Sequence, residues 1–338
     1  TGVAAVIAFA IFIQRFFDPV RDLVLQYTMF QRAMAGAERI FEVLDTVPEI
    51  VDREDALELD DIKGDVVFDN VSLEYVEGIR VLHNIELTVK AGETVAFVGE
   101  TGAGKTSMTA LISRAYDVTE GKVLIDGHDV RDIARRSVTK RMGVVLQDAF
   151  LYTGSVLDNI RYGRLDATHE EVVEAARVVG AHEWIMRLEN GYDTYLNERG
   201  QNLSVGQRQL LAFARAILSN PRILILDEAT ANVDSQTEAL IQRAISRVME
   251  GRTSFVIAHR LSTIRSVDRI VVMDAGRIVE QGSHEELLAS GGYYANLYEM
   301  TYAQHDEDAF DESQALAVLE RMRQRARTGP VLAPAGGD

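Results

Sequence analysis

A glycine-rich segment that ends in a lysine and two hydroxyl residues is the part of the sequence best suited to chemistry. It consists of Gly99, Glu100, Thr101, Gly102, Ala103, Gly104, Lys105, Thr106 and Ser107. This spacing is typical of phosphate-binding loops, because glycines let successive backbone N–H groups point at phosphate oxygens. Lys105 can reach the β- and γ-phosphates, and the Thr106 hydroxyl can bind Mg²⁺. An apolar strand before the loop and an apolar helix after it favour a nucleotide site over an ordinary glycine-rich turn.

An acidic pair follows a second apolar run. Asp227 and Glu228 come directly after residues 223–226, which read Ile-Leu-Ile-Leu. A strand buried on both faces delivers the next residues to the carboxyl edge of a parallel sheet, where ligands bind. Asp227 would hold hydrated magnesium, and Glu228 would orient and polarise the attacking water as general base. The alternative is a solvated helix cap, but together with the phosphate loop the pair predicts Mg-dependent nucleoside triphosphate hydrolysis.

A third segment narrows the choice among families with phosphate loops. Residues 203–209 read LSVGQRQ and resemble the signature sequence of ABC ATPases, although Val205 stands where the commonest form has a second glycine. A hydroxyl, backbone N–H groups and a helix dipole at such a helix start suit a γ-phosphate. The resemblance implies that Ser204, Gly206 and Gln207 bind ATP held by an opposite subunit. It therefore implies a head-to-tail dimer around two ATP molecules.

Four further residues match this family in its order along the chain. Tyr75 resembles the aromatic residue that stacks on adenine, and Gln147 resembles the glutamine that links Mg²⁺ and water to the transmembrane partner. Asp234 is similar to the aspartate that communicates across the dimer, and His259 to the switch histidine at the γ-phosphate. Taken singly, each would be an ordinary core, surface or structural residue. The ordered set extends over about residues 66–301 and implies an ABC ATPase.

Two segments resemble the exporters within this family. Residues 197–200, which read NERG, are similar to a loop that senses the coupling helices, and residues 38–45 resemble the junction between the last membrane helix and the motor. The resemblance implies a membrane protein whose nucleotide-binding domain is cytoplasmic. Its expected partners are a second half-transporter, the coupling helices of the transmembrane domains, and membrane lipids. Homodimer and heterodimer both remain open, as does the transported substrate.

The first residues of the chain are apolar. The run 3–13 is shorter than the roughly 20 residues that a spanning helix needs, so we interpret it as the end of a last transmembrane helix that begins upstream. A buried helix of a soluble protein is the alternative. Residues 14–44 continue with apolar positions at helical spacing, and Pro19 predicts a kink or interruption.

Strands and helices alternate through the rest of the chain, which predicts an α/β domain with a mainly parallel sheet. The expected strands are 66–68, 71–73, 85–89, 94–98, 143–146, 223–226, 254–257 and 269–273, and the expected helices are 169–179, 205–218 and 235–248. The resemblance implies a P-loop NTPase with a RecA-like core, an antiparallel β subdomain and an α-helical signature subdomain. We expect residues 1–45 to be the end of the transmembrane helix and its cytoplasmic extension, and residues 46–65 to be a linker. We expect residues 66–303 to form the nucleotide-binding domain, and residues 304–338 to form an acidic helix and a disordered tail.

Composition excludes some classes of protein. The chain has no cysteine, so disulfides and thiolate metal sites are impossible. Its formal net charge of −17 argues against a protein that coats nucleic acid. Two rival functions remain: a soluble ABC ATPase of DNA repair or translation, and a nucleotide-gated module that switches without turnover. The apolar start disfavours the first rival, and the presence of Glu228 and His259 disfavours the second.

Overall fold

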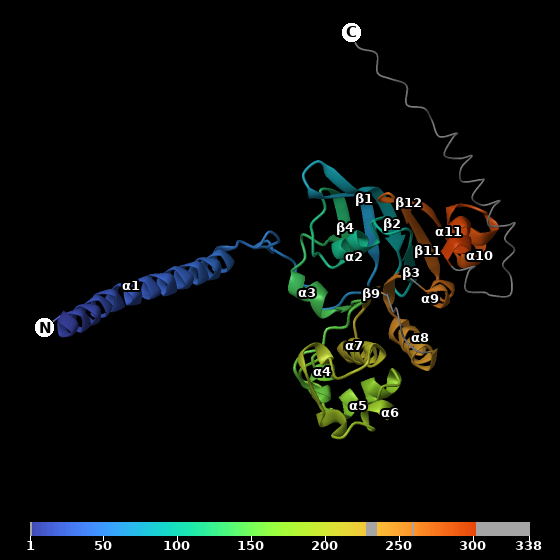
Figure 1. The fold of residues 1–338 in the computed structure, drawn as a ribbon. Coiled ribbons are helices and arrows are strands. Elements are labelled where there is room, and N and C mark those ends of the chain that lie inside the picture. The colour runs from blue at the N-terminus through green and yellow to red at the C-terminus, as the bar shows by residue number, and fades with distance from the viewer. Residues whose placement is uncertain (1, 228–234, 259, 302–338) are drawn as a thin grey trace, which may run out of the picture. The chain divides into compact units, whose positions relative to one another are not determined.

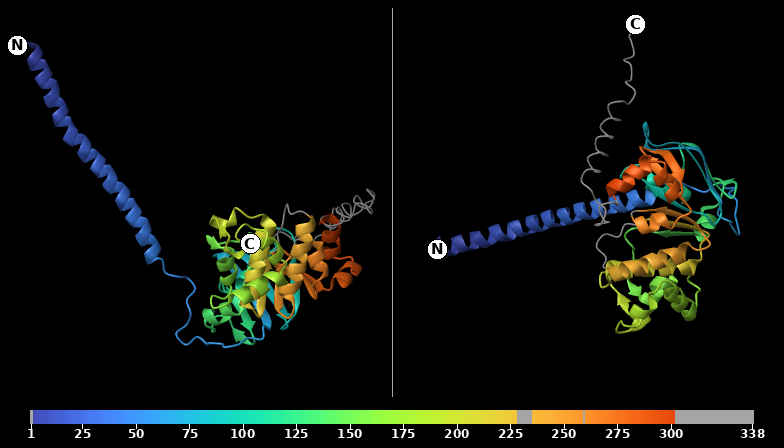
Figure 2. Two further views of the ribbon diagram at one scale, coloured as in Figure 1. Left: turned by 90° about the horizontal axis from the view of Figure 1, so that it is seen from below. Right: turned by 90° about the vertical axis from the view of Figure 1, so that its right-hand side faces the viewer.

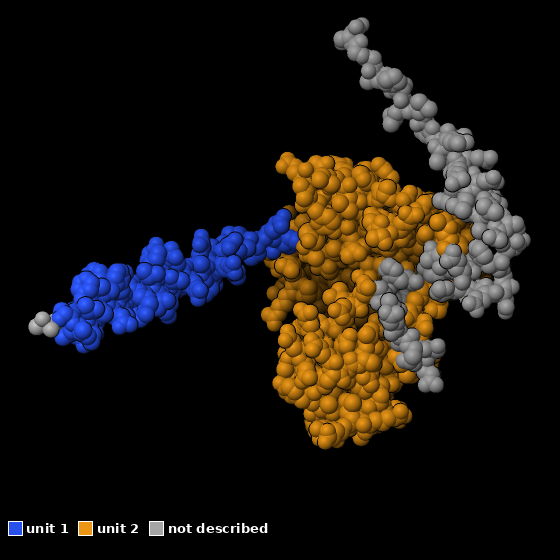
Figure 3. Space-filling view, viewed as in Figure 1, with its two compact units in different colours: residues 1–51 blue, residues 52–338 orange. Residues whose placement is uncertain are grey.

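The computed structural model describes residues 2–227, 235–258 and 260–301. The chain divides into two compact units, residues 1–51 and residues 52–338, which are coloured separately in Figure 3. The predicted sites Glu228, Asp234 and His259 lie outside the described residues.

The first unit consists mainly of one helix. Helix α1 (Gly2–Asp45) has 44 residues and contains Pro19. The helix is continuous through Pro19, so the expected interruption is wrong and the alternative, a kink, stays a prediction. A proline removes one backbone hydrogen bond, while the flanking turns keep theirs. An 18-residue window has a mean hydropathy of 1.7, so the helix is long and apolar enough to cross a membrane. Its length of about 66 Å is roughly twice the thickness of a bilayer's hydrocarbon core.

The second unit is built around a six-stranded sheet (Figure 1). Its order is β12 (Arg277–Gly282), β11 (Arg269–Asp274), β3 (Thr94–Val98), β10 (Thr253–Ile257), β9 (Ile223–Asp227) and β6 (Met142–Val145). Neighbouring strands pair in parallel, except that β12 pairs antiparallel with β11. The predicted mainly parallel α/β sheet is confirmed. The antiparallel edge strand β12 is an addition to the predicted set of strands.

Side chains of β3 fill two separate cores. Ala96 and Val98 face one hydrophobic cluster, and Val95 and Phe97 face the other. The Phe97 ring stacks on that of Phe255 from β10, with centroids 6.0 Å apart. Because successive side chains of a strand point to opposite faces, a continuous apolar run is what a strand buried on both sides requires. The strand therefore holds the start of the following loop firmly.

A four-stranded antiparallel sheet covers one face of the parallel sheet. Its order is β2 (Ile79–Val89), β1 (Val66–Val76), β4 (Glu120–Ile125) and β5 (His128–Asp129). Helices α2 (Lys105–Ile112) and α3 (Arg135–Lys140) belong to the same layer and contribute to its core. The two strands expected at 66–68 and 71–73 form the single strand β1, whose pairing is irregular between Phe68 and Val71.

Part of the predicted linker 46–65 packs on this layer. Ile62 is buried in its core, and the backbone N–H groups of Gly64 and Asp65 donate to the Asp126 carboxylate at 3.0 and 2.9 Å. A β-bridge also joins Leu57 to Ile133. Residues from Asp52 onward belong to the second compact unit.

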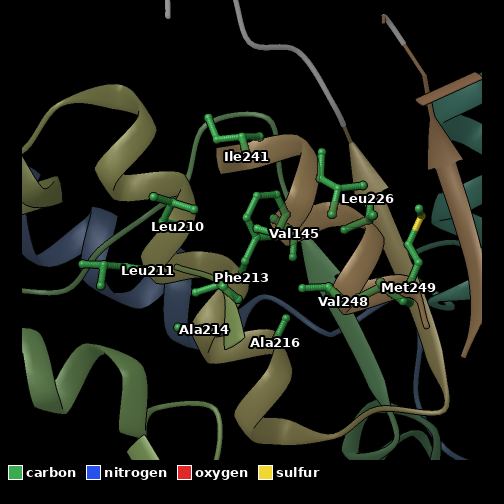
Figure 4. Close-up of a cluster of buried hydrophobic side chains, with 14 of the residues drawn as sticks. Val145, Leu210, Leu211, Phe213, Ala214, Ala216, Leu226, Ile241, Val248 and Met249 are labelled. Atoms are coloured by element: carbon green, nitrogen blue, oxygen red, sulfur yellow. The ribbon is translucent and has the colours of Figure 1, made fainter. Parts of the chain in front are cut away.

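Helices cover the other face of the parallel sheet, at the opposite end of this unit from the antiparallel sheet (Figures 1 and 2). They are α4 (Val156–Arg161), α5 (His169–Val178), α6 (His182–Ile185), α7 (Val205–Ser219) and α8 (Ser235–Met249), with the short strands β7 (Gly154–Ser155) and β8 (Tyr195–Leu196) and the 3-10 turns η1 (Gly191–Asp193) and η2 (Glu198–Gly200). Leu210 and Phe213 of α7 pack with Leu226 of β9 and Ile241 of α8 (Figure 4). The remaining described helices are α9 (Leu261–Arg265), α10 (His284–Ala289) and α11 (Tyr293–Thr301). The helices expected at 169–179, 205–218 and 235–248 are confirmed.

The turn between β11 and β12 joins the two sheets to the glycine-rich loop. Its residues Ala275 and Gly276 have φ values of +42° and +73°, the pattern of a type I′ turn. The Gly276 N–H donates to the Ala103 carbonyl at 3.1 Å, and the Gly276 carbonyl accepts from the His83 N–H at 2.9 Å. A Cβ atom on Gly276 would lie 2.1 Å from the Val81 carbonyl oxygen. Only glycine fits between the loop and β2.

Replacing Gly276 by alanine should therefore destabilise the domain more than the same change at Gly127. Gly127 has a φ of +82° in the corresponding two-residue turn after β4, but a Cβ atom added to it would meet nothing within 4 Å. We expect Gly127→Ala to cost about 1–2 kcal/mol through backbone strain and Gly276→Ala about 2–5 kcal/mol, because the second change also displaces β2. Urea unfolding measures both values, and equal losses would contradict the clamping role of Gly276.

Candidate nucleotide-binding site

Four neighbouring parallel strands end at one edge of the sheet, and the predicted site residues follow them. The glycine-rich loop follows β3, and His259 comes two residues after the end of β10 in the sequence. Asp227 ends β9, and Gln147 lies two residues beyond β6. Register pairs Ile257 with Asp227, which aligns the ends of β10 and β9. The carboxyl edge of such a sheet is where ligands of α/β proteins bind.

The loop passes directly into helix α2. Gly104 caps the helix with a φ of +101°, and a Cβ atom there would lie 2.7 Å from the Leu82 side chain. The helix is anchored by Met108, Leu111 and Ile112, which are almost completely buried. Backbone N–H groups in the first turn of a helix lack intrahelical partners, and the helix dipole is positive there. The start of α2 is therefore suited to an anion such as phosphate.

Lys105 lies over the loop that precedes it. Its Nζ atom donates hydrogen bonds to the carbonyls of Gly99 at 2.7 Å and Glu100 at 2.9 Å. Burial lowers the pKa of the Lys105 ammonium, and the nearby Asp227 carboxylate partly opposes this shift. Within residues 2–227, 235–258 and 260–301, no carboxylate lies within ion-pair distance of it. A bound phosphate would supply the negative charge that this buried cation favours.

The donors near Lys105 fit magnesium. Thr106 is exposed and offers a hydroxyl oxygen, and Asp227 is partly buried and offers a carboxylate at the end of β9. The described part of the chain has no group of three or more His, Cys, Asp or Glu side chains arranged for a metal. Mg²⁺ does not need such a group of side chains, since it keeps several waters and is held by one or two carboxylates together with substrate phosphates.

The structure brings Tyr75 and Ser107 together. The Tyr75 hydroxyl donates to Ser107 Oγ at 2.9 Å, and Ser107 is buried in the first turn of α2. The Tyr75 ring also makes an edge-to-face contact with Tyr116, with centroids 4.7 Å apart. Tyr75 is 44% exposed and Tyr116 is 45% exposed, so part of this aromatic pair is open to solvent. The sequence pattern indicates Tyr75 but carries no signal for Tyr116.

The signature-like segment forms the start of α7. Ser204 caps the helix: its hydroxyl accepts from the Gln207 N–H at 3.2 Å, and the Gln207 side chain accepts from the Ser204 N–H at 2.9 Å. Gly206 is buried, and a Cβ atom there would lie 2.2 Å from Thr237 of α8. Gly206 thus has a packing role as well. In the described regions no hydrogen bond joins Ser204 to the glycine-rich loop.

Comparisons with known proteins agree with this geometry. The family model described as ABC transporter matches residues 82–231. The chain is 47% identical over 301 residues to the uncharacterized ABC transporter ATP-binding protein YfiC of Bacillus subtilis, a match that covers 89% of this chain and 50% of the relative. The chain contains an ABC transporter ATP-binding domain. We refer to residues 52–338 as the ABC unit.

Other proteins similar to this chain are named as a flippase, a fatty acid transporter and an exporter. The ATP-dependent lipid A-core flippase of Syntrophus aciditrophicus is 48% identical over 286 residues, covering 85% of this chain and 47% of the relative. The fatty acid ABC transporter ATP-binding/permease protein of Mycobacterium bovis is 46% identical over 296 residues, covering 88% and 46%. A solved structure of a bacterial Atm1-family ABC exporter with ATP bound has a TM-score of 0.74 and 39% identity, covering 86% of this chain and 50% of that chain. The chain spans about half the length of these relatives.

Removing the Lys105 ammonium should weaken nucleotide binding. We expect Lys105→Ala to bind ATP about 10- to 100-fold more weakly, because charge-assisted hydrogen bonds to phosphate are lost. Isothermal titration would measure this, with Lys140→Ala at the exposed end of α3 as the matched control. In the parent chain, affinity should also fall as the pH rises through the Lys105 pKa, which lies below its usual value of 10.5, because the ammonium becomes neutral. Undiminished binding by Lys105→Ala would contradict the assignment.

Proposed function

We propose that this chain binds and hydrolyses ATP as the motor of an ABC exporter. The observation that carries the proposal is the convergence of the glycine-rich loop, Asp227 and Gln147 at the ends of β3, β9 and β6. Residues 99–107 would bind the phosphates, and Tyr75 would stack on adenine. This role agrees with the ATP-bound exporter to which the chain is similar.

We propose that hydrolysis requires a second copy or a related half-transporter. Ser204 belongs to the helical layer around α7, whereas Lys105 belongs to the layer of α2 and the antiparallel sheet. A helix start that presents a serine hydroxyl and backbone N–H groups suits a γ-phosphate. Ser204, Gly206 and Gln207 of one subunit would thus complete the site at Lys105 of the other, and Asp234 would lie between the two sites.

The chemistry would use charges that the chain holds in place. Thr106, Asp227 and Gln147 would hold Mg²⁺, which when bound would supply positive charge that stabilises the phosphates. Glu228 would accept a proton from the attacking water, and His259 would contact the γ-phosphate. When that phosphate leaves, the contacts that favour the closed dimer are lost, so the subunits separate.

A groove beside β6 supports coupling to membrane helices. The groove has a volume of about 220 Å³ and includes Leu146 and Phe150, which are 58% and 48% exposed. Arg215 shapes it: its guanidinium carbon lies 5.6 and 5.4 Å from the ring centroids of Tyr152 and Tyr162. Exposed apolar surface of this kind marks interaction sites. We propose that the coupling helices of the transmembrane domains dock here, next to Gln147.

Helix α1 would connect this motor to the membrane. Its apolar N-terminal part would lie in the bilayer, and its later turns, where Asp18 and Arg21 form an ion pair, would extend into the cytoplasm. The ABC unit would then lie on the cytoplasmic side of the cell membrane. The relatives named above differ in the cargo that their names state, so similarity at this level selects no substrate.

Glu228→Gln tests hydrolysis without removing the binding site. Glutamine keeps the shape of the side chain but cannot accept the proton, so we expect Mg-dependent ATPase activity to fall about 100- to 10,000-fold while ATP still binds. Glu250→Gln, at an exposed residue just beyond the end of α8, is the control and should keep full activity. If the parent chain binds ATP and never hydrolyses it, alone or with a partner, a nucleotide-gated module becomes the better interpretation.

A further inference from the structure

One contact of the Tyr75 ring fixes the direction in which the ring points, and a second contact restricts the tilt of its face. Its hydroxyl donates to Ser107 Oγ at 2.9 Å, and its ring lies 4.7 Å from that of Tyr116 with an interplanar angle of 75°. The hydroxyl lies on the axis about which a tyrosine ring rotates, so the bond to Ser107 sets where the ring points. It does not set the tilt of the ring face, since rotation about that axis has broad minima. The neighbouring Tyr116 ring restricts this tilt.

The strand that carries Tyr75 is tied to the segment that carries Tyr116. The backbone N–H of Glu74 donates to the Thr119 hydroxyl at 2.9 Å, and the Thr119 N–H donates to the Ser72 carbonyl at 2.9 Å. Glu120, at the start of β4, pairs in register with Ser72. Strand β1 and residues 116–120 therefore keep a fixed spacing.

The other side of Tyr116 is anchored by a buried arginine. Arg114 has a φ of +49° and is only 5% exposed. Its guanidinium donates to Asp117 at 3.1 Å and to Asp52 at 3.2 Å, and it also donates to the Ile133 carbonyl at 3.3 Å. In the sequence, Tyr116 lies between the two ends of the Arg114–Asp117 ion pair. Its backbone is thus held even though its ring is partly exposed.

We propose that Tyr116 is a positioning residue for the nucleobase, acting by orienting the face of Tyr75. The inference rests on the proposed function, in which adenine stacks on Tyr75. Stacking depends on the orientation of the ring face, and an aromatic surface held in place before binding loses less entropy when the base arrives. Tyr116 sets the affinity for the base, and residues 99–106 set the affinity for the phosphates.

Comparing ATP with inorganic tripolyphosphate separates these contributions. We expect Tyr116→Ala in the full chain to weaken ATP binding roughly 2- to 10-fold, the effect of losing one edge-to-face aromatic contact. Tripolyphosphate has no base, so its affinity should not change. Tyr116→Phe keeps the ring and should bind ATP within about twofold of the parent. Tyr195→Ala removes another exposed tyrosine, on β8, and should alter neither affinity.

The remaining outcomes would overturn either this inference or the proposed function. Unchanged ATP affinity in Tyr116→Ala would overturn the inference, and so would an equal loss for both ligands, which would indicate general damage to the fold. If the parent binds tripolyphosphate as tightly as ATP, the base is not recognised and the inference fails while phosphate binding stands. If the parent binds neither ligand, the proposed function itself fails.

Discussion

The burial of β3 on both faces is the constraint on which the rest of the structure depends. Because its side chains enter two cores, the strand cannot shift, and the loop that follows starts from a fixed point. Gly276 holds the far side of the loop through Ala103. This support holds the buried Lys105 ammonium over two carbonyls, an arrangement that a bound phosphate would improve. The proposed phosphate site would thus be formed before the nucleotide arrives.

Local patterns predict most of the fold, because burial dictates residue type. The continuous apolar runs predict β3 and β9 as strands buried on both faces, and Ser204 ahead of an apolar helical pattern predicts the start of α7. Contacts between segments that are distant in the sequence leave no local pattern of residue types. The Tyr75–Tyr116 pair and the fit of Gly276 against β2 depend on how separate segments pack. Pro19 shows the converse, since a strong local breaker is tolerated inside a long helix.

One copy of the chain carries two helix starts at which we propose that an anion binds. The start of α2 follows the glycine-rich loop in one layer, and the start of α7 lies in the layer on the other face of the sheet. Among the described residues, no hydrogen bond links Ser204 to Lys105 or to the glycine-rich loop of the same copy. In the proposed head-to-tail pair of subunits, each helix start would have a partner, and closure would depend on nucleotide. Catalysis would then depend on a site that is divided between two subunits.

Mixing two inactive variants tests whether the site is divided in this way. Lys105→Ala removes the proposed phosphate-binding lysine, and Ser204→Ala removes the hydroxyl of the signature-like segment. If the site is divided between two subunits, a mixed dimer would contain one site with both defects and one intact site. We expect ATPase activity to be low in each variant alone and to recover partly when the two are combined. If the mixture forms mixed dimers yet stays inactive, or if Ser204→Ala alone is fully active, the shared site is contradicted.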